Sequence, residues 1–300
     1  MTNSNIVIKL QEGLQFLSDV PDNSVDLILT DPPYITSRDS GMHRWADHVK
    51  EQDKEESVDV KTEEDWTAYK TDAEWTEWLD KGEVEHKDRE KKLSKLKEDY
   101  LKYGSIYGKK YAVKTNYGSW DSEFTMDKLR LFVGHFYRIL KDGGTCIVFF
   151  DLWKLSYLKE EMEAEKFKQL RLVEWIKTNP QPINSQRNYL TNCREIALLG
   201  VKKGKPTFNS SYDKGIYEYP LYGGKERFHP TQKSLKLLED LIEKHSNEGN
   251  LVLDCFFGSG TTAVAAHNTN RDFIGCELNE GYFNQTTERL SNRDIEFEQD

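Results

Sequence analysis

The sequence predicts an α/β fold with a doubly wound, mostly parallel sheet. Short apolar runs typical of buried strands alternate with amphipathic helical segments over residues 5–29, and again from about residue 126 onward. Two of these runs end in loops of unusual composition, and open α/β sheets bind ligands at the carboxyl ends of their strands. A chain of 300 residues can bury one sizeable core of this kind and still carry an insertion.

The first elements are a strand over residues 6–8, an amphipathic helix near Leu14 and Leu17, and a strand over residues 25–29. After the insertion, apolar positions at helical spacing predict a helix over residues 126–140, which ends at a glycine pair. Further strands are expected at 145–150, 172–176, 195–201, 251–255 and 273–277, and helices at 231–245 and 261–267. The sheet then has seven strands, with the last-formed pair antiparallel.

Two segments interrupt this alternation. Residues 38–118 are rich in charged and aromatic residues, and a structureless loop of that length is improbable inside a compact domain. Aromatic and leucine residues recur there at helical spacing, from Trp66 to Leu79 and from Leu93 to Leu101, so we expect a largely helical inserted subdomain with a small core. The segment 206–228 is a second polar connection and contains four tyrosines.

Composition indicates a soluble, intracellular protein without a bound metal. No run approaches the roughly 18 apolar residues of a membrane span. The four cysteines are widely spaced, which favours reduced thiols over a disulfide or zinc site. The net charge of −10 is unusual for a protein that binds nucleic acid, but residues 51–100 contain 18 acidic and 10 basic residues and so carry most of it. The near-neutral remainder is compatible with a basic groove.

The loop after the strand at 25–29 consists of Asp31, Pro32, Pro33 and Tyr34. A carboxylate and a proline carbonyl only accept hydrogen bonds, so together they suit an amino group, and the ring offers a face for stacking. Taken alone, the same residues also form an ordinary turn.

The loop after the strand at 251–255 contains two glycines, Gly258 and Gly260, where the backbone can approach a ligand closely. Alone it also fits any nucleotide site or a tight turn between strand and helix. The full Gly-x-Gly-x-x-Gly fingerprint of dinucleotide sites is absent, because Thr261 and Thr262 are followed by Ala263 at the position of its third glycine.

With both loops in this order, the chain resembles the permuted (β-class) DNA amino-methyltransferases, which transfer a methyl group from S-adenosylmethionine to an exocyclic nitrogen of a DNA base. The resemblance covers about residues 5–37 and 120–290. It implies a class I methyltransferase Rossmann-like sheet with circularly permuted motif order. Residues 1–37 and 119–300 then form the catalytic domain, while 38–118 and 206–228 are candidates for target recognition.

The resemblance also implies roles for individual residues. Asp31 and the Pro32 carbonyl accept the two hydrogens of the target amine, Pro33 stiffens the loop, and Tyr34 stacks on a flipped base. In this family an Asp at the first position usually accompanies adenine N6 methylation and a Ser cytosine N4 methylation, so Asp31 points to adenine.

Residues that match the family's cofactor segments follow the same logic. Glu277 is expected to accept both ribose hydroxyls, by the reasoning that holds for dinucleotide folds. Glu12 replaces a usual Asp that reaches the adenine amine, and the segment from His229 onward covers the methionine end, unless Thr231 merely caps a helix. The full set of expected cofactor contacts is Glu12, His229, Thr231, Gln232, Lys233, Asp254, Phe256, Gly258, Ser259, Gly260, Thr261, Thr262, Glu277, Leu278 and Asn279.

Expected DNA contacts fall into three groups. Lys177 and Asn179 follow a strand near the catalytic edge, and Ser37, Arg38 and Arg44 come shortly after Tyr34 in the chain. The third group alternates with tyrosines, as in surfaces that bind unstacked nucleic acid, and comprises Lys109, Lys110 and Lys114.

The sequence therefore predicts an S-adenosylmethionine-dependent DNA adenine N6-methyltransferase that acts on double-stranded DNA. Cytosine N4 methylation is the alternative within the class, and a non-catalytic DNA-binding partner subunit is the alternative outside it. A homodimer and a cognate restriction endonuclease stay open as partners, and no membrane is expected. A cytoplasmic location in a prokaryotic or phage context follows from this reading.

Overall fold

A computed structural model describes residues 4–33, 61–70, 94–98, 100–102, 124–180, 192–221, 223, 228–229 and 231–299. The chain divides into two compact units, one formed by Met1–Asp39 with Gly118–Asp300 and the other by Ser40–Tyr117.

The described residues of the larger unit form one nine-stranded sheet with the order β6-β4-β5-β3-β2-β7-β8-β1-β9. The strands from β3 to β9 in that order run parallel to one another, whereas β5 is antiparallel to both β3 and β4. The strands are β1 (Ile6–Leu10), β2 (Val25–Thr30), β3 (Leu140–Phe150), β4 (Lys168–Lys177), β5 (Arg194–Val201), β6 (Ile216–Tyr219), β7 (Leu251–Asp254), β8 (Asp272–Glu277) and β9 (Glu298–Gln299).

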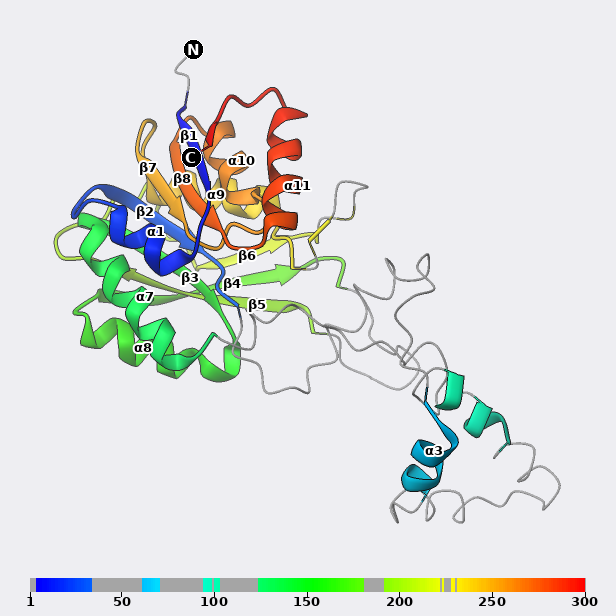
Figure 1. Ribbon diagram of the computed structural model, residues 1–300. Helices are drawn as coiled ribbons and strands as arrows, with labels where there is room; N and C mark the ends of the chain where they lie inside the picture. The colour runs from blue at the N-terminus through cyan, green and yellow to red at the C-terminus, as the bar shows by residue number, and fades with distance from the viewer. Residues whose placement is uncertain are drawn as a thin grey trace. The chain divides into compact units, whose positions relative to one another are not determined.

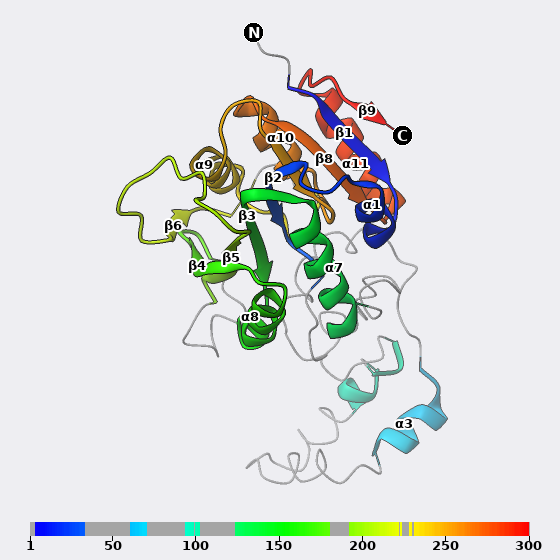
Figure 2. The same cartoon turned by 90° about the vertical axis from the view of Figure 1, so that its left-hand side faces the viewer.

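Helices cover both faces of this sheet (Figures 1 and 2). Apolar side chains of α1, α7 and α8 form one core with one face of the strands, and those of α9, α10 and α11 form a second core with the other face. The predicted doubly wound α/β fold is therefore confirmed. The helices are α1 (Gly13–Asp19), α7 (Met126–Ile139), α8 (Leu155–Ala164), α9 (Leu235–His245), α10 (Thr261–Asn268) and α11 (Glu280–Ser291).

Several details differ from the expectation. The sheet has two further strands, β6 inside the polar segment 206–228 and the short β9. The last pair of the expected strands, β7 and β8, is parallel, so the predicted antiparallel pairing there was wrong, and β5 is the reversed strand instead. The predicted helix at 231–245 begins only at Leu235. Neither α8 nor α11 had been predicted.

The second unit is described over two helical stretches, α3 (Glu63–Lys70) and residues 94–102 apart from residue 99. Its helix α3 begins with a reciprocal capping box, in which the Thr62 backbone N–H donates to Asp65 and the Asp65 N–H donates to the Thr62 hydroxyl. The buried rings of Trp66 and Tyr100 pack with their centroids 5.5 Å apart. The expected small helical core is present in these residues, and the other aromatic positions predicted for it lie outside the described residues.

Candidate active site

The two predicted site loops lie side by side because their strands are neighbours. In the parallel pairing of β2 with β7, Leu27 lies opposite Val252 and Ile28 opposite Leu253. Asp31 directly follows β2 and Asp254 ends β7, so both carboxylates lie at the carboxyl edge of the sheet. β8 and β1 come next in the strand order. β8 ends at Glu277, and β1 ends two residues before Glu12. Segments far apart in sequence thus meet at this edge, as parallel sheets arrange them.

Asp254 connects the two loops. It is buried, and its carboxylate accepts hydrogen bonds from the hydroxyls of Thr30 and Thr262, both at 2.7 Å, and from the backbone N–H of Phe256 at 3.1 Å. Thr30 immediately precedes Asp31, and Thr262 lies in the first turn of α10. Burial raises the pKa of Asp254 to about 6, although the threonine hydroxyls favour the ionised form. Asp254 therefore fixes one loop relative to the other.

This raised pKa predicts a pH-dependent stability. The folded pKa lies above the usual 3.8, so the contribution of Asp254 is fully present below about pH 4 and is lost as pH rises through about 6. Between about pH 5 and 7.5 we expect the wild type to lose roughly 1–1.5 kcal/mol of unfolding free energy relative to Asp254→Asn, which does not titrate. Urea unfolding of both proteins at the two pH values measures this difference. A pH-independent difference would show that Asp254 ionises at its ordinary pKa.

The glycine loop is fixed by contacts behind it. Gly260 has a left-handed backbone with φ +66°, and a Cβ atom there would collide with the Thr286 side chain. Thr286 donates from its hydroxyl to the Gly258 carbonyl at 2.8 Å, and Arg289 donates to the Ser259 carbonyl at 2.6 Å and to the Thr261 hydroxyl at 2.9 Å. The predicted residues Ser259, Thr261 and Thr262 are buried and hold the loop in shape, so its backbone is the part that is suited to contact a ligand.

Glu277 ends β8 with both carboxylate oxygens oriented by backbone donors. Oε2 accepts from the Gly258 N–H at 3.0 Å and Oε1 from the Asn279 N–H at 2.8 Å. Burial raises the pKa of Glu277, and these two hydrogen bonds oppose that rise. Each carboxylate oxygen can accept more than one hydrogen bond, so the group keeps capacity for hydroxyl donors. The Asn279 side chain caps α11 by accepting from the Tyr282 N–H at 3.1 Å.

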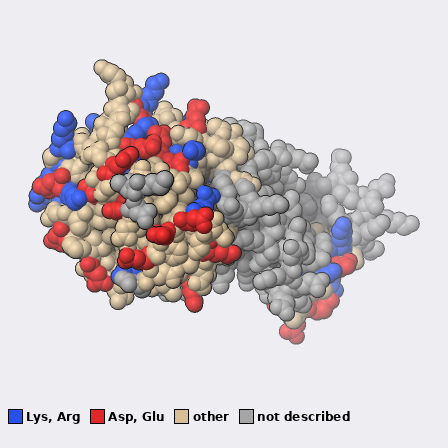
Figure 3. Space-filling view, turned by 90° about the horizontal axis from the view of Figure 1, so that it is seen from above, with Lys and Arg blue, Asp and Glu red and all other residues tan. Residues whose placement is uncertain are grey.

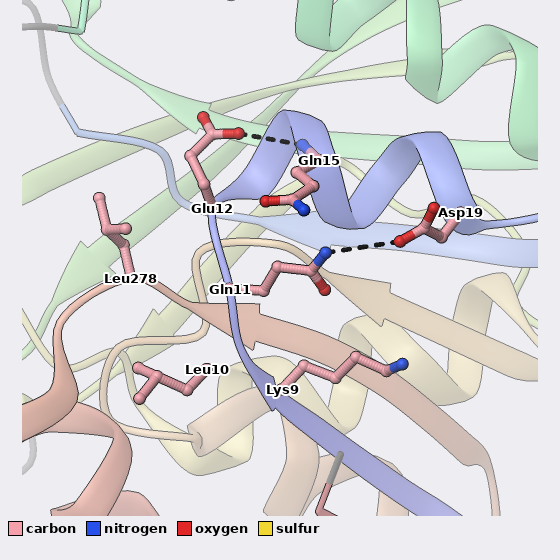
Figure 4. A pocket seen from close by; sticks show the side chains of 7 residues that line it. All are labelled: Lys9, Leu10, Gln11, Glu12, Gln15, Asp19 and Leu278. Carbon is pink, nitrogen blue, oxygen red and sulfur yellow. Dashed lines mark hydrogen bonds between the residues drawn. The ribbon is translucent and has the colours of Figure 1, made fainter.

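A pocket of about 630 Å³ opens between the end of β1 and the segment after β8 (Figure 4). Leu278, which is half exposed, lines it together with residues 9–12 and two residues of α1. Glu12 caps the N-terminus of α1, where its carboxylate accepts from the Gln15 N–H at 3.0 Å. Glu12 and Leu278, two of the expected cofactor contacts, thus border one pocket.

The segment from His229 to Lys233 reaches both loops. A Cβ atom on Gly258 would lie 3.2 Å from Nε2 of His229, so this ring lies against the glycine loop. Thr231 is exposed and contacts the His229 ring, and it does not cap α9, which begins later. Gln232 is 3% exposed, and neither polar atom of its amide has a hydrogen-bond partner among the described residues. Lys233 is 7% exposed, and its ammonium group contacts Asp31.

Lys177 and Asn179 are used within the protein. Lys177 is buried, and its ammonium group lies 2.6 Å from a carboxylate oxygen of Glu195, so it is not presented to a phosphate. The Asn179 amide exchanges hydrogen bonds with the backbone of Leu221, accepting from its N–H at 2.6 Å and donating to its carbonyl at 3.3 Å. Asn179 therefore links the end of β4 to the segment 206–228.

The remaining predicted residues divide into two groups. Phe256 packs on Phe124 and Phe132, with ring centroids 5.6 and 4.8 Å away, and so contributes to the core next to the glycine loop. Pro32 is buried and Pro33 is half-buried at the end of β2. The residues that lie outside the described part of the chain are Tyr34, Ser37, Arg38, Arg44, Lys109, Lys110 and Lys114.

Glu195 was missed by the sequence analysis, which treated it only as the first residue of a strand. Because β5 runs antiparallel to β3, its beginning lies at the edge where the parallel strands end. Glu195 contacts Lys177 with one oxygen and Lys233 with the other, at 3.0 Å. The sequence shows a charged residue at the start of an apolar run. Only the direction of β5 shows that this residue lies at the edge where the parallel strands end.

The described residues contain neither a membrane-spanning helix nor a cluster of metal ligands. None of the helices there is long and apolar enough to cross a membrane. In the same residues, histidine, cysteine and carboxylate side chains do not gather in groups of three that could hold a metal ion.

Comparison with known proteins gives matches along most of the chain. The model of the N6_N4_Mtase family, described as DNA methylase, matches residues 25–288. The type II methyltransferase M2.DpnII of Streptococcus pneumoniae is 30% identical over 236 residues, which cover 68% of this chain and 88% of that protein. M2.LlaDCHI of Lactococcus lactis subsp. cremoris, also a type II methyltransferase, is 31% identical over 198 residues, or 60% of this chain and 73% of that protein.

Solved structures show the same fold. The M1.HpyAVI–SAM complex aligns with a TM-score of 0.58 and 24% identity over 95% of this chain and 98% of that one. The PvuII DNA methyltransferase, named as cytosine-N4-specific, aligns with a TM-score of 0.61 and 16% identity over 99% and 95%. Given the family match over most of its length, this chain belongs to the N6/N4 DNA methylase family.

Proposed function

We propose that this protein is a site-specific DNA methyltransferase that methylates the N6 amine of adenine with S-adenosylmethionine as methyl donor. One observation carries the proposal. Asp31, an acceptor for an amine, lies at the same sheet edge as the glycine loop, and Asp254 ties the two loops together through Thr30 and Thr262. An amine acceptor next to a cofactor loop is the arrangement that amine methylation requires.

The residues at this edge fit S-adenosylmethionine. The oriented carboxylate of Glu277 suits the ribose hydroxyls, and the pocket beside Leu278 and Glu12 suits the adenine. The buried amide of Gln232, without a hydrogen-bond partner among the described residues, is a polar group that a bound methionine moiety can satisfy. When bound, this cofactor supplies a methyl group made electrophilic by its sulfonium.

The chain's own residues act on the amine. An exocyclic amine is a poor nucleophile because its lone pair is delocalised into the ring. Hydrogen bonds accepted by Asp31 and by the Pro32 carbonyl free that lone pair and stabilise the positive charge that develops on the nitrogen. A base within a duplex cannot reach this edge, so the target adenine is flipped out, with Tyr34 as its stacking face.

The choice of adenine rests on Asp31 at the first position of the loop. The fold does not decide between the two bases, since the PvuII enzyme that shares it is named as cytosine-N4-specific. Double-stranded DNA incubated with the protein and S-adenosylmethionine, digested and analysed by mass spectrometry, should contain N6-methyladenine. Accumulation of N4-methylcytosine would overturn the adenine assignment, and absence of any methylated base would overturn the proposed function.

The relatives suggest the biological setting. They are named type II methyltransferases, so we propose a restriction–modification system with a cognate endonuclease and a cytoplasmic location. A homodimer and the recognition roles of 38–118 and 206–228 stay predictions. Figure 3 shows both acidic and basic side chains on one face of the described surface.

The basic residues of the insertion give a further prediction. Replacing Lys109, Lys110 and Lys114 together by alanine should weaken DNA binding, because lysines that neutralise phosphates release counterions. The slope of the logarithm of the binding constant against the logarithm of the salt concentration should become shallower by about 0.9 per lost phosphate contact. Binding titrations at several salt concentrations measure it, with cofactor affinity as the control. An unchanged salt slope would place the phosphate contacts elsewhere.

A further inference from the structure

Four charged side chains form a cluster at the catalytic edge, here called the charge cluster: Asp31, Lys177, Glu195 and Lys233. Lys233 lies between the two carboxylates, in contact with Asp31 Oδ2 and 3.0 Å from Glu195 Oε2. The other oxygen of Glu195 lies 2.6 Å from the ammonium group of Lys177. The cluster therefore alternates in sign and is neutral as a whole.

Burial of these charged side chains carries an unfavourable free energy. Lys177 and Lys233 are buried, and the side chain of Glu195 is 12% exposed. Taking charges out of water carries a penalty that pairing only repays when the geometry is good, and apolar residues often stabilise such a position better. Burial alone would raise the pKa of Glu195, but the two ammonium groups outweigh it and hold that pKa below its usual value. A buried anion kept charged in this way points to a role beyond packing.

We infer that Glu195 is a positioning residue for methyl transfer, which holds the ammonium group of Lys233 against Asp31 and is itself balanced by Lys177. The effect on Asp31 has two parts. Lys233 fixes the carboxylate through Oδ2, and Glu195 fixes Lys233, so the acceptor geometry does not depend on the flexible lysine chain alone. Glu195 also pairs with the ammonium group of Lys233, so the positive charge of Lys233 does not act on Asp31 alone.

The sharing of the Lys233 charge between two carboxylates matters for the reaction. A carboxylate fully neutralised by one lysine stabilises a developing positive charge poorly, because the lysine repels that charge. With Glu195 as a second anion at 3.0 Å from the same ammonium group, more of the negative charge of Asp31 stays available to the amine nitrogen. Lys177 satisfies the far oxygen of Glu195 and so prevents an uncompensated buried anion.

The inference rests on the proposed function, and the test separates the two. In Glu195→Gln the shape is kept but the anion is lost. We expect the single-turnover rate of methyl transfer to fall by about a hundredfold, as for a misplaced catalytic group, while the affinities for S-adenosylmethionine and DNA stay unchanged. The matched control is Asp26→Asn, an ion-paired carboxylate at the opposite end of the same strand β2, which should keep the wild-type rate.

A second variant guards against a folding defect. Glu195→Gln leaves one excess buried positive charge, and the double variant Lys177→Met/Glu195→Gln removes it. If Glu195 positions Lys233, the double variant regains stability in thermal unfolding but stays slow. Recovery of the rate together with stability, or a Glu195→Gln variant as fast as the wild type, would overturn the inference. A wild-type protein that methylates no DNA would overturn the proposed function instead.

Discussion

Replacing Asp31 by alanine is expected to lower the rate of methyl transfer by about a hundredfold or more, because a positioned electrostatic group of this kind typically contributes that much. The affinity for S-adenosylmethionine should survive, because in the proposed mechanism Asp31 binds the target amine, whereas most of the proposed cofactor contacts follow the strands β7, β8 and β1. Single-turnover kinetics and calorimetry measure the two quantities separately. The loss should appear in the rate and not in the Michaelis constant for the cofactor.

The alanine variant also leaves the buried Lys233 with one carboxylate partner fewer. Asp31→Asn is therefore a useful companion, because it keeps the size and one acceptor oxygen but removes the charge. Both variants should be slow if the negative charge is needed in the transition state. If the alanine variant retained about a tenth of the wild-type rate, Asp31 would not be the main acceptor, since such groups are usually worth more.

The sequence predicted the two loops because each follows a short apolar run that is typical of a buried strand. Local pattern suffices for Asp31 and Asp254, since parallel strands bring their carboxyl ends to one edge. It did not suffice for Glu195, whose place depends on the direction of β5. Strand direction is set by pairing between residues distant in sequence, such as Cys146 with Gly200, and periodicity carries no information about it.

Burial of polar residues was equally hidden. Gln232 and Lys233 were predicted as cofactor contacts, but nothing in the sequence predicted that both side chains are buried. Lys233 is buried because it meets Asp31 and Glu195, which come from positions about 200 and 40 residues away in the chain. A polar residue can be buried in a protein when such partners pair with it, and only the tertiary structure brings these partners together. Asp254 and Lys177 are likewise buried together with partners from distant parts of the chain.

Glu277→Ala is expected to weaken S-adenosylmethionine binding by roughly 1.5–3 kcal/mol, the usual contribution of hydrogen bonds to a charged group. The carboxylate is held by the backbone N–H groups of Gly258 and Asn279, so it is already oriented before the cofactor binds. Calorimetric titration of the wild type and the variant measures the loss. Glu277→Gln should lie between the two, since its amide keeps one acceptor oxygen.

The same backbone contacts make a second explanation testable, because loss of the carboxylate also releases the Gly258 N–H and could loosen the glycine loop. A cofactor analogue without ribose hydroxyls separates the two effects. If Glu277 binds those hydroxyls, the analogue binds the wild type and Glu277→Ala equally well, and the variant loses affinity only for the natural cofactor. If the variant weakens both ligands alike, Glu277 acts by shaping the loop, and the ribose is bound by other residues.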